Sequence, residues 1–364
     1  MIQVLSPIVI YFSKKNSNHL FLITIFMLSS GLFRIKKLGL SFIFVISTIL
    51  LLSKTVLQRR PSIDPIPPNE ITVHPSYSAI SPPIFSQWTA KPCQVGEKID
   101  LLIVVHSSPS HILHRKAIRQ TWGSNAVGQG LNIRTVFAVG RSKLPRIQQR
   151  VNSESKANGD IVGVEMIDSY TNLTLKHVAG LRWAVKNCAG VEYVLKADDD
   201  AFVDVSRALK VIKSAGLSSS SIACRVVPQG TSPRRFGKWM VTRQDYPYDA
   251  YPEYCSGLAY FGRPSAMAKV YEAAVSGKVP YLWIDDVYLT GLAAQAAEVS
   301  RLDIGVWFAR TEDMVIKWMK SAGDTKRVLP WIVAEMTPRH WPSEAEDLWR
   351  MIRMTQRKPL NSLR

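Results

Sequence analysis

The sequence lacks the short motifs that mark several common classes of enzyme and binding protein. No G-x-G-x-x-G follows the first predicted strand, and no G-x-x-x-x-G-K-[ST] is present, so neither a dinucleotide dehydrogenase nor a P-loop nucleotide hydrolase is supported. The chain also has no zinc-finger spacing, no RNP-like aromatic motif and no long block of lysine and arginine. A nucleic-acid-binding function is therefore disfavoured despite the formal net charge of +18.

Carboxylates are missing from the N-terminal region, where the first one is Asp64. Eight lysines and arginines precede it, and subtracting them from the net charge of +18 leaves +10 on the rest of the chain. We interpret the charge as partly topogenic and partly suited to an anionic ligand such as a nucleotide diphosphate.

The N-terminal region contains two hydrophobic runs. The first, residues 20–33, ends at a basic segment, and the second, residues 38–53, is almost purely apolar. Sixteen residues are short for a bilayer span of about 20, but extension to Leu57 with Lys54 snorkelling makes up the length. We therefore predict a signal anchor at 38–57, a cytoplasmic segment at 1–37 and a lumenal remainder.

Two alternatives to this topology stay open. A cleaved signal peptide would compete with an anchor, but no convincing small-x-small cleavage site follows the apolar run. Translation starting at Met27 rather than Met1 would give a short basic tail and a single anchor.

The segment that follows, residues 58–98, is rich in proline and serine. Such a composition disfavours helices and central strands and is typical of an extended spacer. Residues 99–364 are then predicted to form one large globular domain, so the layout is that of an enzyme held away from a membrane.

Only four cysteines are present, and all of them follow the predicted anchor: Cys93, Cys188, Cys224 and Cys255. Their spacing fits no zinc motif, so two disulfides are expected in an oxidising lumen, with three connectivities open and buried free thiols as the alternative. Asn172 begins the one glycosylation sequon, Asn-Leu-Thr.

The globular part alternates strand-like and helix-like patterns. We predict strands at 100–105, 133–139, 161–167 and 193–196, with helices at 111–122, from about Pro145, and at 173–188. This alternation predicts an α/β fold with a mostly parallel central sheet flanked by helices.

Three consecutive carboxylates, Asp198, Asp199 and Asp200, end the last of these strands. Clustered like charges are costly to desolvate unless a cation compensates them, and ligands bind outside the carboxyl ends of strands in open α/β sheets. Hard oxygen ligands of this kind suit Mg²⁺ or Mn²⁺. An acidic turn or helix cap is the simpler alternative.

Three further segments carry candidate chemistry. Arg115 and Arg119 share one helix face, which predicts either an anion between them or a solvated basic face. Asp285 and Asp286 at an apolar helix start are either an N-cap or a pocket carboxylate suited to general-base work. The aromatic segment 251–261 either lines a sugar site or belongs to the core.

Taken together, the motifs between residues 99 and 350 resemble the β-1,3-galactosyltransferase family of Golgi glycosyltransferases, which also contains β-1,3-N-acetylglucosaminyltransferases. Each motif is weak to moderate alone, but the ordered set is highly specific. The motifs that carry the resemblance are Arg115-x-x-Ile118-Arg119-x-Thr121-Trp122, the segment 168–176, the triplet 198–200, Lys238-Trp239, Tyr246-Pro247, Tyr251-Pro252-x-Tyr254-Cys255-Ser256-Gly257 and Asp286-Val287.

The resemblance implies a GT-A fold and an inverting, Mn²⁺-dependent transfer of a sugar, galactose by first choice, from a UDP-sugar to a glycan acceptor. The predicted anchor and stem agree independently with such an enzyme, so we expect a single-pass type II protein of the Golgi membrane with a lumenal catalytic domain and no nucleic-acid partner.

Residue roles also follow from the resemblance. It implies Asp200 as metal ligand, Asp198 near the ribose or the metal, and His340 as a further metal ligand. The usual Glu-Asp-Val is Asp285-Asp286-Val287 here, and we expect Asp286 to be the base and Asp285 to orient or cap. Further nucleotide-site candidates are Arg115, Arg119, Asp168 and Lys176.

Other functions remain as alternatives. The nearest is the same chemistry with UDP-N-acetylglucosamine or UDP-N-acetylgalactosamine. A catalytically silent lumenal binding protein would keep the fold without the reaction, although such a protein has no need of Asp198, Asp200 and Asp286 together.

Overall fold

A central sheet built from buried apolar strands dominates the computed structural model, which describes residues 84–86, 89–91, 93–94, 96–124, 130–321, 332–336, 341 and 343–356. The predicted cytoplasmic segment, the predicted anchor, most of the Pro-rich segment and His340 lie outside these residues. Among the described residues, no helix combines the length and the apolar character needed to cross a bilayer.

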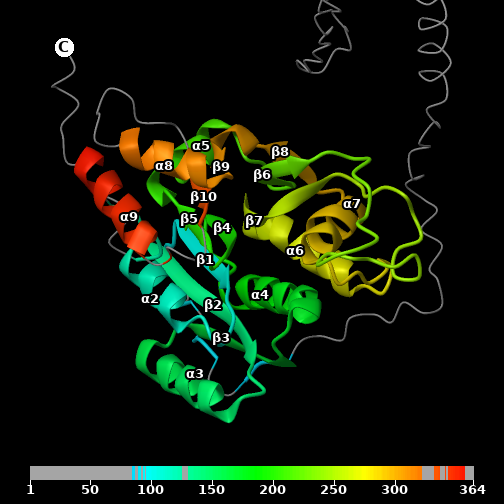
Figure 1. Ribbon diagram of the computed structural model, residues 1–364, viewed down its shortest axis with the longest axis horizontal. Coiled ribbons are helices and arrows are strands. Elements are labelled where there is room, and N and C mark those ends of the chain that lie inside the picture. The colour runs from blue at the N-terminus through cyan, green and yellow to red at the C-terminus, as the bar shows by residue number, and fades with distance from the viewer. Residues whose placement is uncertain are drawn as a thin grey trace, which may run out of the picture. The chain divides into compact units, whose positions relative to one another are not determined.

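The sheet has seven strands in the order β3-β2-β1-β4-β7-β6-β8 (Figure 1). Strands β1 to β4 run parallel, β7 is antiparallel to both neighbours, and β8 is parallel to β6. The predicted mostly parallel sheet is therefore confirmed. Its strands are β1 (Leu101–His106), β2 (Ile133–Arg141), β3 (Ile161–Ile167), β4 (Tyr193–Asp198), β6 (Ser221–Val227), β7 (Tyr254–Gly262) and β8 (Ser300–Asp303).

Helices cover both faces of this sheet (Figure 1). The longer helices are α2 (Ile112–Gln120), α3 (Pro145–Asn158), α4 (Leu173–Asn187), α5 (Val205–Ser214), α6 (Pro264–Val275), α8 (Glu312–Ser321) and α9 (Ser343–Gln356). Shorter ones are η2 (Tyr170–Asn172), η3 (Val287–Ala293), α7 (Ala294–Ala296) and η4 (Gly305–Trp307). The helices predicted at 111–122, from Pro145 and at 173–188 are confirmed as α2, α3 and α4.

The side chains of β1 point alternately to the two faces of the sheet and so contribute to two separate core clusters. Leu101, Ile103 and Val105 pack with α2, α5 and α9, whereas Leu102 and Val104 pack with α4, α6 and η3. Because successive side chains of a strand point to opposite faces, one fully buried strand supplies both clusters.

A second, smaller sheet lies beyond the acidic end of β4. It contains β5 (Ala201–Val203), β10 (Val333–Glu335) and β9 (Phe308–Ala309), with β10 between the other two. The turn at residues 199–200 joins β4 to β5, so the carboxylate triplet lies where the two sheets meet.

All four cysteines form disulfides, Cys93 with Cys188 and Cys224 with Cys255. The first bond ties the end of the Pro-rich segment to the end of α4, and the second joins β6 to β7. The expected pair of disulfides is thus confirmed, with a connectivity that the sequence left open.

Candidate active site

A cleft of about 590 Å³ opens beside the carboxyl end of β4. Its lining brings together carboxylates that are far apart in the chain: Asp198, Asp200, Asp285, Asp286 and Glu335. The two acidic motifs singled out in the sequence therefore share one cavity.

The carboxylate triplet divides between two environments. Asp198, one third exposed, and Asp200 line the cleft, whereas Asp199 turns away and accepts a 2.9 Å hydrogen bond from His111 Nδ1. The Oδ1 atom of Asp200 is buried and has no hydrogen-bond partner within the described structure. Burial raises the pKa of Asp198 to about 7 even though Lys196 opposes the shift.

Lys196 is the cation that compensates this acidic cluster. The side chain is fully buried, and its Nζ donates to Asp198 Oδ1 at 2.6 Å and to the Gly257 carbonyl at 2.5 Å. Burial alone would lower the pKa of Lys196, but Asp198, Asp285 and Asp286 outweigh it and raise that pKa. Lys196 was not among the residues predicted for the site, although its place two positions before Asp198 puts both side chains on one face of the strand.

Asp285 and Asp286 have different surroundings despite being adjacent. Asp285 accepts a 2.8 Å hydrogen bond from His177 Nδ1, and the other ring nitrogen of His177 lies 2.6 Å from the Tyr260 hydroxyl. Burial opposes ionisation of Asp285, but the His177 contact and Lys196 lower its pKa. For Asp286, burial and the neighbouring charge of Asp285 raise the pKa to about 7. Two carboxyl groups whose environments push their pKa values apart are suited to different roles.

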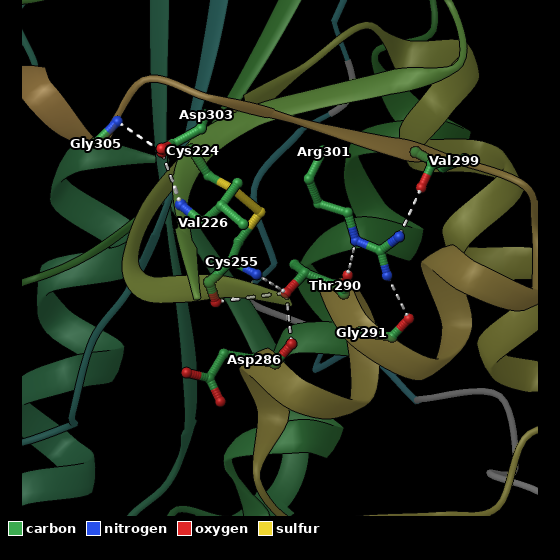
Figure 2. The surroundings of a disulfide bond; sticks show 10 residues. All are labelled: Cys224, Val226, Cys255, Asp286, Thr290, Gly291, Val299, Arg301, Asp303 and Gly305. Atoms are coloured by element: carbon green, nitrogen blue, oxygen red, sulfur yellow. Dashed lines mark hydrogen bonds between the residues drawn. A yellow bond between two sulfur atoms is a disulfide. The ribbon is translucent and has the colours of Figure 1, made fainter. Parts of the chain in front are cut away.

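The backbone that carries Asp286 is anchored by Thr290 of the same helix η3 and by Arg301 of β8 (Figure 2). The Thr290 hydroxyl donates to the Asp286 carbonyl at 2.5 Å and accepts from the Cys255 N–H at 2.9 Å, next to the Cys224–Cys255 disulfide. Arg301 donates to the carbonyls of Thr290 and Gly291, each at 2.8 Å. These contacts support η3, a π-helix, and such segments are frequent at functional sites.

The two arginines of α2 lie away from the cleft. Arg115 is fully buried and makes a bidentate pair with Glu154 at 3.0 and 2.7 Å. Arg119 donates to Glu154 at 2.7 Å and to both oxygens of Asp160 at 2.7 and 2.9 Å. An anion does lie between the two cations, but it is the carboxylate of Glu154 on α3, so we leave both residues out of the proposed site.

Two other nucleotide-site candidates, Asp168 and Lys176, pair with each other at 2.7 Å. Lys176 also donates to the Ser107 carbonyl at 3.0 Å, and Asp168 accepts from the Gly140 N–H at 2.9 Å. The pair thus joins the carboxyl ends of β1, β2 and β3, the edge at which open α/β sheets bind ligands. A nucleotide role for it stays a prediction, as does glycosylation of half-buried Asn172, whose side-chain amide donates to the Ile167 carbonyl at 2.9 Å.

Residues 113–304, slightly more than half of the chain, match the Galactosyltransferase family. The chain belongs to the galactosyltransferase family. It is 32% identical to human β-1,3-galactosyltransferase 5 over 190 residues, which cover 52% of this chain and 61% of that protein. It is also 32% identical to mouse β-1,3-galactosyltransferase 1 over 191 residues, covering 52% and 58%. The match thus spans about three fifths of the length of these curated relatives.

Solved structures that match part of this chain include the galactosyltransferase LgtC in complex with donor and acceptor sugar analogues. It is 11% identical and covers 71% of this chain and 98% of its own, with a TM-score of 0.35. Mouse xyloside xylosyltransferase 1 is also 11% identical and covers 67% and 99%, with a TM-score of 0.30.

In this galactosyltransferase-family chain, the cleft carboxylates fit a divalent cation. The unpartnered Asp200 Oδ1 supplies a free ligand atom, and Asp198 and Glu335 provide further hard oxygens in the same cavity. Such a donor set suits Mg²⁺ or Mn²⁺ rather than a softer metal.

The remaining wall of the cleft in this protein is lined by aromatic and basic side chains. Tyr170 and Trp283 contact edge to face at 5.9 Å, and the Trp239 indole N–H donates to the Tyr170 hydroxyl. Lys238 lies 4.8 Å from the Tyr170 ring centre. Tyr251, Tyr254 and residues 256–258 also line the cleft, so the predicted aromatic segment reaches the cavity. Cleft cations that the sequence analysis missed are Arg225, Arg234 and Arg310.

Proposed function

We propose that this galactosyltransferase-family protein is an inverting β-1,3-hexosyltransferase that transfers galactose from a UDP-sugar to a hydroxyl of a glycan acceptor. The proposal includes a GT-A catalytic domain and rests on one observation above all. Asp200, whose Oδ1 atom has no hydrogen-bond partner among the described residues, lines the same cleft as Asp286, whose pKa is raised to about 7.

Asp286 is suited to the role of general base. A base works best when its pKa lies near the operating pH, because it is then ionised often enough to accept a proton and basic enough to hold it. The carboxylate would take the proton of the acceptor hydroxyl as that oxygen forms a bond to the anomeric carbon. The bond from this carbon to the phosphate oxygen breaks at the same time, and UDP leaves with the electron pair, which inverts the anomeric configuration.

Asp285 would position this base rather than accept the proton itself. Its hydrogen bond from His177 keeps it ionised, and its negative charge helps to raise the pKa of Asp286. Both carboxylates also interact electrostatically with Lys196, which donates a hydrogen bond to Asp198 of the proposed metal site.

Asp198 and Asp200 would hold the divalent cation in the cleft that Asp286 also lines. When bound there, Mn²⁺ would supply Lewis-acid stabilisation for the charge on the departing diphosphate. His340 is a further candidate ligand from the sequence, outside the described residues.

The proposal extends to location and layout. We infer a type II protein of the Golgi membrane, with segment 1–37 in the cytosol, an anchor at 38–57, a stem at 58–98 and the catalytic domain at 99–364 in the lumen. The two disulfides support folding in an oxidising compartment.

The decisive experiment measures transfer and hydrolysis by the full chain across UDP-galactose, UDP-N-acetylglucosamine and UDP-N-acetylgalactosamine, with Mn²⁺ and a glycan array. We expect UDP-galactose to be the donor, and preference for either acetylated donor would replace that part of the proposal. Activity with no UDP-sugar would instead favour a silent binding protein.

Substitution of Asp286 tests its assignment as the general base. Asp286→Asn should preserve UDP-galactose binding, measured by calorimetry, and reduce turnover by about 10²–10⁴-fold. Asp249→Asn, at an exposed carboxylate paired with Arg243, is the matched control and should leave both quantities unchanged. Normal turnover in Asp286→Asn would refute the assignment.

A further inference from the structure

The proposed reaction leaves the third carboxylate of the triplet unused. Asp199 lies in the turn after β4 and faces the start of α2, where His111 and His114 meet it. One nitrogen from each histidine and one oxygen of the aspartate lie within 4.8 Å of one another. Asp199 is buried, whereas the side chain of His111 is 43% exposed, so the cluster is reachable from solvent.

The separations within this cluster are short enough for one metal ion to contact all three side chains. His111 Nδ1 lies 2.9 Å from Asp199 Oδ2, and His114 Nδ1 lies 3.6 Å from Asp199 Oδ1. Two ligands of a tetrahedral Zn²⁺ with bonds of about 2.0–2.1 Å are about 3.3 Å apart, between the two observed values.

Hydrogen bonding within the described structure leaves one atom of the cluster unsatisfied. His114 Nδ1 is buried and has no hydrogen-bond partner, because 3.6 Å to Asp199 exceeds hydrogen-bond length. A buried polar atom without a partner is destabilising, and a bound metal ion would satisfy it.

The charge on Asp199 also suits a cation. Its carboxylate is buried beside two imidazoles, and desolvating a carboxylate is costly unless a cation compensates it. The nearest positive side chain on the same helix, Arg115, is neutralised by Glu154.

Rigid elements hold the three side chains in place. His111 and His114 lie one turn apart at the start of α2, and the Asp199 N–H donates to the His106 carbonyl at 3.1 Å. The His114 ring also contacts Trp341 edge to face, 5.4 Å between ring centres. A site on such elements needs little rearrangement to bind.

We propose that His111, His114 and Asp199 form a second metal site, selective for Zn²⁺ or a chemically similar transition-metal ion and separate from the carboxylate site in the cleft. Two imidazoles and one carboxylate are ligands that zinc accepts, whereas Mg²⁺ and Mn²⁺ prefer the all-oxygen set of Asp198 and Asp200. Three protein ligands leave a fourth position for water. The proposal is independent of the transferase reaction.

The test titrates Zn²⁺ by calorimetry into the full chain after removal of metals with a chelator. We expect a Zn²⁺ site that persists in Asp200→Asn, which removes a carboxylate of the cleft, and that weakens at least about tenfold in His114→Gln. Lys116→Gln, at an exposed position on the same helix, is the matched control and should bind as the unaltered chain does.

Co²⁺ provides a second readout. It should give the visible absorption of a four-coordinate ion in the unaltered chain and in Asp200→Asn, but not in His111→Gln or His114→Gln. Thermal unfolding with chelator present checks that the variants are folded. Equal Zn²⁺ affinity in His114→Gln and the unaltered chain, or binding that disappears with Asp200→Asn alone, would overturn the proposal.

Discussion

Asp286 carries a prediction about pH. Burial and the charge of Asp285 raise its pKa to about 7, and a base must be ionised to act. The ionised fraction is small below this value and nearly complete above it, so kcat/KM should rise about tenfold per pH unit up to about pH 7 and then level off. A pH–rate profile with saturating metal measures this.

The control for this profile is Asp285→Asn. Removing the neighbouring negative charge takes away one cause of the raised pKa, so the rising limb should move to lower pH. An unmoved limb would mean that a different group sets it.

Lys196 carries a prediction about stability. Lys196→Met would leave Asp198, Asp285 and Asp286 without their shared cation, and breaking buried ion pairs typically costs 3–5 kcal/mol. Because Asp198 is one third exposed, we expect a loss of about 3 kcal/mol in the free energy of unfolding, measured with urea. Lys213→Met, at an exposed pair with Glu192, should change it by less than about 1 kcal/mol. Similar losses in both variants would contradict a special role for Lys196.

At the residue scale, the sequence pointed to groups whose motifs are local. Asp198, Asp200 and Asp286 stand in short motifs and the structure places them in one cleft, while their roles stay predictions. Their partners His177 and Glu335 were missed, because these lie on other elements and reach the site only through the packing of the chain. A lone histidine or glutamate in a sequence carries no sign of its neighbours in space.

At the scale of elements, α2 and α3 are joined by buried charge. Within the described structure, Arg115 donates its hydrogen bonds to Glu154 and to the loop before α2, and it does not line the cleft. Arg115→Met should therefore lower the free energy of unfolding by about 3–5 kcal/mol while leaving the KM for the UDP-sugar unchanged at temperatures where the variant is folded.

The opposite outcome is equally informative. A raised KM with unaltered stability would return Arg115 to the nucleotide site that the family resemblance implied. Glu154→Gln is the partner control, since it removes the charge shared with Arg119 and should be destabilising in the same way.

Most elements were predictable because their patterns are strong. The strand at 161–167 and the helix from Pro145 match the structure, since buried parallel strands are continuous apolar runs and proline favours the first turn of a helix. The π-helical turn of η3 was not predictable, because it depends on Thr290 and Arg301 holding carbonyls that ordinary helical spacing would satisfy internally.

At the scale of the whole molecule, the two disulfides close loops of different length. The bonded cysteines are 95 residues apart for Cys93–Cys188 and 31 for Cys224–Cys255. Loop-entropy arguments give losses of about 4–5 and 3–4 kcal/mol when each pair is replaced by serine. Denaturant unfolding of the two double variants measures both.

Activity should separate the two bonds. Only Cys255 contacts the threonine that supports Asp286, so loss of Cys224–Cys255 should lower kcat even at temperatures where the protein is fully folded. Loss of Cys93–Cys188 should leave kcat unchanged. Equal effects on kcat would mean that the bonds act through global stability alone.

The bond between β6 and β7 has a practical consequence for anyone preparing this protein. Protein made in a reducing bacterial cytosol would lack the disulfide next to Thr290. A high yield of soluble protein would then not guarantee a high specific activity. Batches should then be compared by their content of free thiols, because two preparations of equal purity would differ in turnover according to how completely Cys224 and Cys255 had been oxidised.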